Sequence, residues 1–507
     1  MELTPHESPP VVDADLLIRG GRVVDPRSGR DGVADVAVRD GRIVAVGTAA
    51  VQATTVVEAQ GLTVVPGFID LHSHAQTPLG LMLQAFDGVT SALDLEAGAL
   101  PIPDHYADAE REGRPIGFGF SACWASARLH VMDGVPLRGT GPSGRLLSSP
   151  ELVLRNQRSP RWQHPASARE RTAVIGAMSD ALEAGALGIG MLLGYCPGAG
   201  RNEVLDIARL AAAAGVTVFV HVRYMSNAGP ASSLDAITEM VDVAAETGVH
   251  LHVCHVNSTS LRLIDDVMLA IERARAQGGR ITTEAYPYTT SSTGIGAAFL
   301  DPAQLWRLGI EPDAITYLPT GRRVRDATEL ALLRERDPGG LCLIDYLDER
   351  VPADERLVTR SFQEAGTVVA SDAMPLVDAS GAYVRDAVKL LPGMHTHPRS
   401  VGTFARTFGR LVRERSVLTL HDAVLRTSTL PAEMLAPFVP QMQRKGRIAV
   451  GFDADITVLD ERTITDRGSF AAVTPSTGIE HVFVGGRPVV RRGAAGADLA
   501  AGRSIRR

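Results

Sequence analysis

The middle of the chain alternates between short apolar runs and longer stretches with helical periodicity. We expect helices at residues 167–184, 203–214, Ser233–Thr247 and 261–277, with apolar runs such as 216–221 between them. Short apolar runs that alternate with helices are typical of parallel strands joined by crossover helices. The sequence therefore predicts an α/β fold, a TIM-like (β/α)8 barrel that spans residues 67–439.

The two ends of the chain have a different pattern. Residues 12–65 contain short alternating segments separated by Gly-Gly and Asp-Gly turn signals, which predict a small antiparallel sheet. Strand-like segments return at 454–459 and 482–490. We expect the two ends, 1–66 and 440–507, to pair into one small β-sandwich domain. The Gly-, Ala- and Arg-rich tail, 491–507, is predicted to be a loose terminus.

Composition restricts the partners of the chain. Its 507 residues carry a formal net charge of −7, so no basic stripe is expected to attract nucleic acid or an anionic membrane. The start lacks a basic and then apolar leader, and no apolar stretch is long enough for a membrane span. We expect a cytoplasmic protein that acts on a small molecule, and the oligomeric state stays open. The four cysteines form no Cys-x-x-Cys pair and are expected to be reduced.

A pair of histidines ends the first apolar run of the middle region. The sequence Gly67-Phe68-Ile69-Asp70-Leu71-His72-Ser73-His74 places His72 and His74 two residues apart. On a strand, residues at this spacing point to the same face, so both imidazoles can converge on one point. A divalent metal commonly occupies such a point, although exposed histidines on a strand give the same pattern.

Further polar residues end other apolar runs. His221 ends residues 216–221, His255 follows 249–254, and Asp372 follows 367–371. In an eight-stranded barrel the C-terminal strand ends form one rim, so these residues can meet there. Together with His72 and His74 they predict a metal centre. His250 and His252 are expected to be packing or surface histidines, because a regular strand directs them away from His255.

The motifs resemble those of the amidohydrolase superfamily, and in particular its N-acyl-D-amino acid deacylase (D-aminoacylase) branch. The resemblance covers about residues 16–490. Besides the histidine pair, the motifs that carry it are Gly188-Ile189-Gly190, His221-Val222-Arg223, Tyr286-Pro287-Tyr288, His397-Pro398-Arg399, Gly402-Thr403-Phe404 and Lys445-Gly446-Arg447.

The resemblance implies roles for individual residues. It implies one or two zinc ions held by His72, His74, His221 and His255, with Asp372 as a further ligand and the catalytic proton-transfer residue. It also implies that Arg399, with one tyrosine of the pair Tyr286 and Tyr288, grips the substrate carboxylate. Of the two tyrosines, the resemblance favours Tyr288.

The sequence departs from the branch at three places. No cysteine stands on the strand that begins Gly88-Val89-Thr90, where the branch has a bridging cysteine; Glu96 is the expected substitute ligand and Asp94 its rival. Asn257 replaces a lysine of the expected carboxylate pocket, which predicts a preference for neutral over acidic side chains. The segment between Asp372 and Arg399 is also longer than in the branch.

These observations predict a zinc-dependent amidohydrolase that cleaves the amide bond of N-acyl-D-amino acids. Hydrolysis of cyclic amides is the alternative, but relatives with that activity use a carboxylated lysine on a middle strand, and residues 116–220 contain no lysine. A metal-free scaffolding protein on the same fold is a third hypothesis, which the intact histidine set disfavours.

Overall fold

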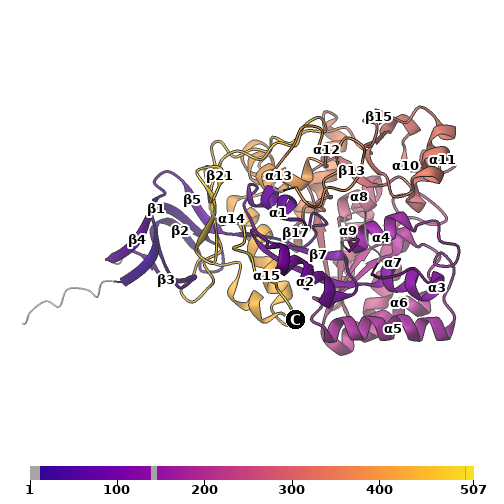
Figure 1. Ribbon diagram of the computed structural model, residues 1–507, viewed down its shortest axis with the longest axis horizontal. Coiled ribbons are helices and arrows are strands. Elements are labelled where there is room, and N and C mark those ends of the chain that lie inside the picture. The colour runs from indigo at the N-terminus through magenta and orange to yellow at the C-terminus, as the bar shows by residue number, and fades with distance from the viewer. Residues whose placement is uncertain (1–11, 49, 139–145, 388, 497) are drawn as a thin grey trace, which may run out of the picture.

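The computed structural model describes residues 12–48, 50–138, 146–387, 389–496 and 498–507. A β-sheet built from both chain ends lies at one end of the elongated molecule, and a larger α/β body forms the rest (Figure 1). No helix in the described ranges is long and apolar enough to cross a membrane.

The larger body is a nearly closed barrel of eight parallel strands. Its strands follow chain order around the sheet, as the pairings of neighbouring strands show. A bridge between Ser73 and Ala373 joins the first and last strands just beyond their ends. This confirms the predicted fold class. The strands are β6 (Phe68–Asp70), β7 (Val89–Ala99), β8 (Gly117–Cys123), β9 (Ile189–Leu192), β10 (Thr217–His221), β11 (His250–Val253), β12 (Ile281–Ala285) and β17 (Thr367–Val369).

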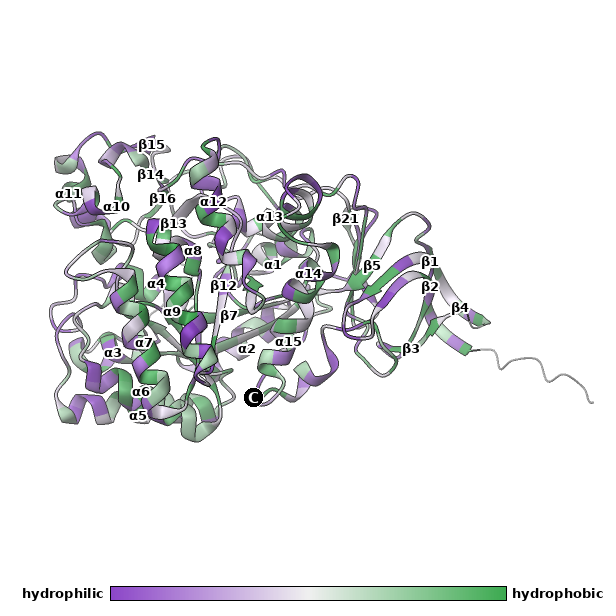
Figure 2. Cartoon of the chain, turned by 180° about the vertical axis from the view of Figure 1, so that it is seen from behind, coloured by the Kyte–Doolittle hydropathy of each residue, from purple (hydrophilic) through white to green (hydrophobic). Residues whose placement is uncertain are grey.

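Helices surround the barrel, with their apolar sides turned inward (Figure 2). Ser167 and Ser232 cap the helices that follow them in capping boxes, in which the cap hydroxyl accepts from the third backbone N–H of the helix. The remaining bounds lie within a few residues of the expected ones. The main helices between barrel strands are α1 (Pro78–Ala85), α2 (Ile102–Glu112), α3 (Trp124–Asp133), α4 (Ser149–Arg155), α5 (Ala168–Glu183), α6 (Arg201–Ala214), α7 (Ser233–Thr247), α9 (Ile264–Ala276) and α12 (Pro352–Arg360), and α13 (Arg399–Arg406) follows the last strand.

Strands from both chain ends form one nine-stranded sheet, in which β18 pairs with β5. The expectation of a purely antiparallel first segment is wrong, because β4 and β5 both run parallel to β1. The division at residues 66/67 and 439/440 stays a proposal. The strands are β1 (Val12–Asp25), β2 (Arg30–Arg39), β3 (Arg42–Gly47), β4 (Val51–Glu58), β5 (Thr63–Pro66), β18 (Ile456–Leu459), β19 (Ile479–Val484), β20 (Arg487–Arg491) and β21 (Ala494–Ala495).

An insertion between β12 and β17 was not expected from the sequence. It holds a four-stranded sheet in the order β13-β16-β14-β15, together with α10 (Leu305–Leu308) and α11 (Ala327–Arg336). Its strands are β13 (Thr290–Gly294), β14 (Ile315–Tyr317), β15 (Arg322–Arg323) and β16 (Leu341–Asp345). Because the insertion follows the C-terminal end of β12, it reaches the rim where the site is expected.

The C-terminal tail is not loose, so that expectation is wrong. Ile505 is buried in an apolar cluster with Ile69, Leu93 and Leu187. The backbone N–H of Ile505 donates to the carbonyl of Phe118 at 2.8 Å, so the last residues add an edge contact at the start of β8. The expectation failed because Gly, Ala and Arg predict exposure, whereas this single isoleucine anchors the segment.

Candidate metal centre

The predicted ligands come from five different barrel strands and meet at one rim. His72 and His74 follow β6, Glu96 lies in β7, and His221 ends β10. His255 follows β11 and Asp372 follows β17. Apart from Glu96, which lies three residues before the end of its long strand, each stands at or just beyond the C-terminal end, where loops of a barrel build active sites. All six side chains are largely buried.

Glu96 lies between two pairs of histidines. Its Oε1 is 3.1 Å from Nδ1 of His221 and 2.7 Å from Nε2 of His255. Its Oε2 is 3.1 Å from Nε2 of His72 and 3.5 Å from Nε2 of His74. One carboxylate therefore faces both pairs, each with a separate oxygen, which is the arrangement of a bridging ligand.

Asp372 completes the cluster on the side of the first pair. Its Oδ1 is 3.4 Å from Nε2 of His72 and 3.6 Å from Nε2 of His74. Its Oδ2 accepts from Nη2 of Arg399 at 2.7 Å. The backbone is left-handed at Asp372, with φ of +49°, and at His255, with φ of +30°. Left-handed non-glycine residues cost free energy and cluster at functional sites, which fits the role expected for both residues.

Two further carboxylates hold the histidine rings from behind. Oδ1 of Asp94 lies 3.1 Å from Nδ1 of His74, so Asp94 faces the ring nitrogen that points away from Glu96. Glu284, inside β12, places Oε1 2.5 Å from Nδ1 of His72 and Oε2 2.9 Å from Nε2 of His252. Carboxylates in such positions fix the tautomer and orientation of metal-binding histidines.

Glu284 was missed by sequence reasoning. It lies within a buried strand, whereas the predicted histidines and Asp372 stand at or just beyond strand ends. The signal available was a single carboxylate in the otherwise uncharged run Ile281–Ala285. Burial of such a group is costly unless it is paired, so its position predicts a buried partner.

The cluster shifts the pKa values of its own members. Burial disfavours the imidazolium of His72, but Glu96, Asp372 and Glu284 outweigh this effect and raise its pKa well above the usual value. The pKa of His74 rises to about 9, because Asp94 and Glu96 outweigh burial. Burial alone would raise the pKa of Glu96, yet the surrounding histidines hold it well below its usual range. Glu96 thus stays an anion among the histidines, although burial lowers the pKa of one of them, His221.

The residues fit a divalent metal. Three of the candidate groups, His72/His74/Glu96, His72/His255/Asp372 and Glu96/His221/His255, have ligand atoms that all lie within 4.8 Å of one another. Imidazole and carboxylate donors suit zinc and neighbouring transition metals. For both histidines of the first pair, Nε2 faces the centre while Nδ1 faces a carboxylate, as metal ligation requires.

A pocket lies against the cluster. Glu96, His221, His255 and Asp372 contribute to its wall, together with side chains from the insertion and from the segment after Asp372. The longer segment that the sequence revealed between Asp372 and Arg399 thus supplies part of the pocket.

Of the predicted substrate-binding residues Tyr286, Tyr288 and Asn257, only Tyr286 is among the described residues that line the pocket. Tyr286 lines the pocket, and its ring lies 4.6 Å from the guanidinium of Arg399. Tyr288 donates to Asp466 at 3.2 Å and contacts Arg406, outside the described wall of this pocket. Asn257 bonds the backbone of Tyr286 through both of its amide atoms and is likewise outside this wall.

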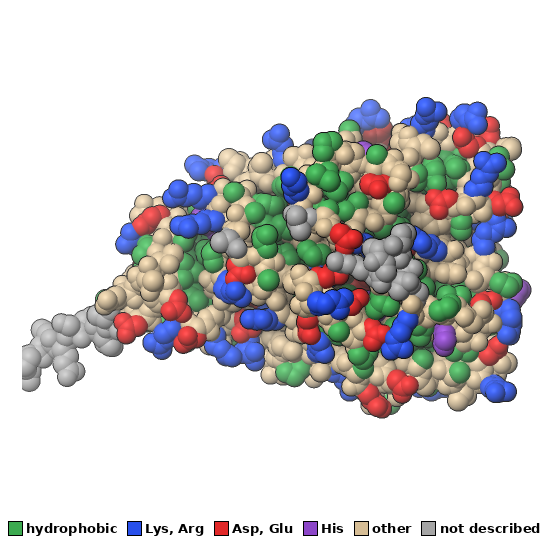
Figure 3. Space-filling view, in the orientation of Figure 1, with side chains coloured by type: hydrophobic (Ala, Val, Ile, Leu, Met, Phe, Trp, Pro, Cys, Tyr) green, Lys and Arg blue, Asp and Glu red, His purple; other side chains and the backbone are tan. Residues whose placement is uncertain are grey.

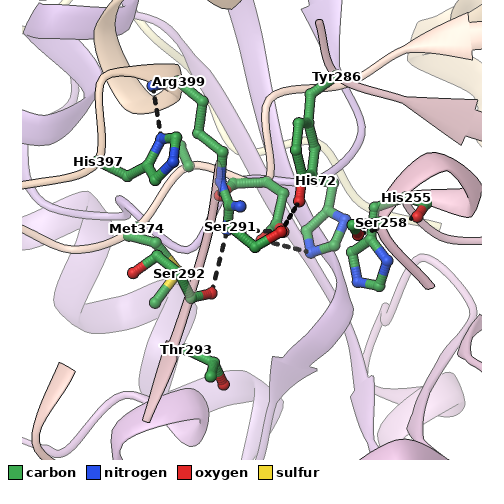
Figure 4. Close-up of polar contacts among 12 residues, drawn as sticks. His72, His255, Ser258, Tyr286, Ser291, Ser292, Thr293, Met374, His397 and Arg399 are labelled. Atoms are coloured by element: carbon green, nitrogen blue, oxygen red, sulfur yellow. Dashed lines mark hydrogen bonds and ion pairs between the residues drawn. The ribbon is translucent and has the colours of Figure 1, made fainter. Parts of the chain in front are cut away.

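Arg399 is fully buried and held on one side (Figure 4). Its Nε donates to the carbonyl of Asp372 at 2.7 Å, and its Nη2 contacts the carboxylate of Asp372 and the carbonyl of Ser292. Its Nη1 is buried and has no hydrogen-bond partner among the described residues. Buried donors are normally paired, so this atom lacks a partner that a bound ligand could supply, although Arg399 itself is not among the residues that line the pocket.

Comparison with known proteins places the chain among hydrolases. The family model described as "Amidohydrolase family" matches residues 55–331. The chain is 32% identical to an N-acyl-D-glutamate deacylase of Alcaligenes xylosoxydans xylosoxydans, over 93% of each protein. It is 26% identical to a D-aminoacylase of the same organism, over 94% of each.

Among solved structures, the chain is similar to the N-acyl-D-glutamate deacylase of Bordetella bronchiseptica, with a TM-score of 0.75 and 25% identity. The match covers 98% of this chain and all of that one. That structure is described as a complex with zinc and a phosphonate inhibitor that mimics the tetrahedral intermediate of the reaction.

Proposed function

Because the chain belongs to the amidohydrolase family, in the branch of the N-acyl-D-amino acid deacylases, we propose that it hydrolyses the amide bond of N-acyl-D-amino acids with the help of bound zinc. The products are a carboxylate and a free D-amino acid. The observation that carries the proposal is Glu96, whose two oxygens face two histidine pairs beside a pocket.

We propose two neighbouring metal positions, which we call half-sites. His221 and His255 with Oε1 of Glu96 would hold one ion, and His72 and His74 with Oε2 of Glu96 and Asp372 a second. A divalent ion held there supplies a Lewis acid that polarises the amide carbonyl and makes an attacking water more acidic. Two cations would need an anion between them, and Glu96 would supply it in place of the cysteine of the branch.

Asp372 is the proposed acid and base. Its carboxylate lines the pocket beside the histidines, within reach of a water that attacks the amide carbon. It accepts the proton of that water and then delivers it to the amide nitrogen as the carbon–nitrogen bond breaks. Arg399 keeps the carboxylate of Asp372 in place through Nη2, which leaves Oδ1 directed at the cluster.

Arg399 and Tyr286 are proposed to bind the carboxylate of the substrate. Nη1 of Arg399 is the unpaired donor of a guanidinium that makes its other contacts within the protein, and the ring of Tyr286, which lines the pocket, lies 4.6 Å from this guanidinium. Tyr286 therefore takes the role that the sequence gave preferentially to Tyr288. A charged hydrogen bond of this kind orients the scissile amide over the ligands.

The alternatives receive less support. The two lysines of the chain are Lys389 and Lys445, and neither belongs to a barrel strand, so no carboxylated lysine can serve cyclic-amide hydrolysis. A metal-free scaffold would have no need of two histidine pairs around a buried carboxylate, because that arrangement is costly without a cation.

The test uses the purified protein, elemental analysis and a panel of N-acetyl amino acids of both hands. We expect about one to two zinc ions per chain, hydrolysis of D-isomers, and loss of activity with a chelator that zinc restores. Active protein without any transition metal would contradict the metal assignment. Activity confined to L-isomers or to cyclic amides would contradict the proposed substrate.

A further inference from the structure

Part of the pocket lining consists of apolar side chains. They come from α4, from β9 and the loop after β10, and from the insertion. We call this surface the apolar wall and define it by Val153, Leu154, Leu192, Met225, Phe299 and Ile344. Phe299 stacks on the ring of His221 at a centroid distance of 5.9 Å, so the wall begins at the metal centre itself.

The polar groups near the apolar wall are already engaged with one another. The hydroxyl of Tyr195 bonds Thr293 at 2.7 Å, and that of Tyr286 bonds Ser291 at 2.7 Å. The hydroxyl of Tyr346 donates to the sulfur of Met225 at 3.4 Å. A ligand that enters this side therefore meets mainly carbon atoms.

The charges of the pocket disfavour a second carboxylate in the substrate. Of the described residues that line it, Glu96 and Asp372 carry negative charge, and none is a lysine or arginine. Nη1 of Arg399 can serve one carboxylate, the one on the α-carbon. Apart from the histidines of the metal centre, no described side chain of the pocket would offer a second carboxylate a cation, and burial of an unpaired charge is strongly unfavourable.

One neutral donor remains in this region. The hydroxyl of Tyr383 is buried without a hydrogen-bond partner among the described residues, and it lines the pocket. A single phenol does not neutralise a carboxylate, and burial raises the pKa of Tyr383, so the group stays protonated. It can donate one hydrogen bond to a carbonyl or hydroxyl of a ligand.

We infer that the apolar wall binds an apolar substituent of the substrate, either a large side chain of the D-amino acid or a long acyl chain, and that acidic side chains are poor substrates. The inference rests on the proposed function. It separates this chain from the N-acyl-D-glutamate deacylases that it resembles.

The first experiment measures kcat/KM of the zinc-loaded protein for five compounds. N-acetyl-D-leucine and N-acetyl-D-phenylalanine test the side chain, N-octanoyl-D-alanine tests the acyl group, and N-acetyl-D-alanine and N-acetyl-D-glutamate are references. We expect at least one apolar compound to exceed both references by about 10-fold or more, as pockets that select several methylenes do. The compound that gains shows which substituent contacts the wall.

Other results have separate meanings. If N-acetyl-D-glutamate equals or exceeds every apolar compound, the inference is wrong while the proposed function holds. If no apolar compound exceeds N-acetyl-D-alanine, the apolar wall does not select the substrate, so the inference is again wrong while the proposed function holds. If no N-acyl-D-amino acid is hydrolysed, the proposed function fails and the inference with it.

A substitution tests the wall directly. Met225→Lys introduces a cation on a side chain of similar length, and we expect it to shift the ratio of kcat/KM towards N-acetyl-D-glutamate by about 10-fold or more. Leu332→Lys, at an exposed position on α11, is the matched control and should leave the ratio unchanged. A folded Met225→Lys variant with an unchanged ratio would overturn the assignment of the wall. The panel on the natural chain decides the matter if the variant does not fold.

Discussion

Glu96 and Asp94 lie two residues apart on β7, and they face different atoms of the histidines. Glu96 contacts the ring nitrogens that face the centre, whereas Asp94 contacts Nδ1 of His74 from behind. We expect Glu96→Gln to lose bound metal and most turnover, because no anion is left between the half-sites. Asp94→Asn should keep metal with an affinity about 10- to 100-fold lower. Metal content and rate of both variants check this.

The opposite result would exchange the two roles. If Glu96→Gln retains full metal and rate while Asp94→Asn loses both, Asp94 is the ligand.

A carboxylate is also a harder ligand than the cysteine of the branch. The natural chain should therefore accept manganese or cobalt more readily than a cysteine-bridged site does.

Glu284 supports the site from inside the barrel. Its carboxylate contacts His72 and His252 and accepts from the backbone N–H of His255 at 3.3 Å. Glutamine has one acceptor oxygen, so Glu284→Gln cannot accept from both rings, and we expect metal affinity to fall about 10- to 100-fold. Competition with a chelator dye measures this.

A second buried glutamate provides the control for Glu284. Glu203 bonds Trp124 and Arg128 away from the metal centre and is equally buried. Glu203→Gln removes the anion that pairs with Arg128 and should lower stability, yet it should leave metal affinity unchanged. Equal loss of affinity in both variants would show that Glu284 has only a general structural role.

At the residue scale, the sequence predicted which side chains meet but not how each is used. The meeting of the five proposed ligands at strand ends could be predicted because a barrel brings those ends together. The proposed choice of Tyr286 over Tyr288 depends on the contacts of Tyr288 with Asp466 and Arg406, which are remote in sequence. No local pattern contains that information.

At the scale of elements, caps and periodicity predicted the helices well. Ser232 and Asp235 form a capping box, and the helix they begin has the expected bounds. The insertion was missed because its strands are short and pair out of chain order, β13 with β16. The parallel pairing of β4 with β1 was also missed, since turn signals indicate where strands end but not which strands pair.

His250 joins three barrel strands and gives a pH-dependent contribution to stability. It contacts Thr217 on β10 at 2.9 Å and Thr282 on β12 at 3.0 Å. Burial, with His252 and Arg280, lowers its pKa to about 3. Between pH 3 and the unfolded value near 6.5 the unfolded chain binds more protons, so this contribution is present at pH 7 and is lost as the pH falls.

We therefore expect His250→Gln to reduce the pH dependence of the free energy of unfolding. From pH 7 to pH 5 the natural chain should lose about 2 kcal/mol through this histidine, and the variant should not. Urea unfolding of both proteins at the two pH values measures the difference. An identical loss in both would show that His250 is not held neutral by the fold.

At the scale of the whole molecule, basic and acidic side chains are interspersed on the face shown in Figure 3. The functional charges are instead gathered inside, at the barrel rim. The chain ends complete the outer sheet, and the last residues return to the opposite end of the barrel, where β8 begins. Sequence composition could not predict this return, because it depends on one buried side chain and on backbone hydrogen bonds.

Substitution of Ile505 tests whether this residue anchors the C-terminal tail to the barrel. Its side chain is 2% exposed, its carbonyl accepts from the hydroxyl of Tyr106 at 2.6 Å, and the ring of Tyr106 lies 4.1 Å from the guanidinium of Arg506. Ile505→Ala should lower the free energy of unfolding by about 2–5 kcal/mol, as truncation of a buried isoleucine does. Arg503→Ala, an exposed neighbour, should change it by less than about 0.5 kcal/mol.

The same variant separates stability from catalysis. The tail contacts the N-terminal end of β8, whereas the metal centre lies at the C-terminal ends of the strands. Below its melting temperature, Ile505→Ala should therefore keep the kcat and metal content of the natural chain. If kcat falls in fully folded protein, the tail is coupled to the site through the barrel. If stability is unchanged, Ile505 does not anchor the tail in solution.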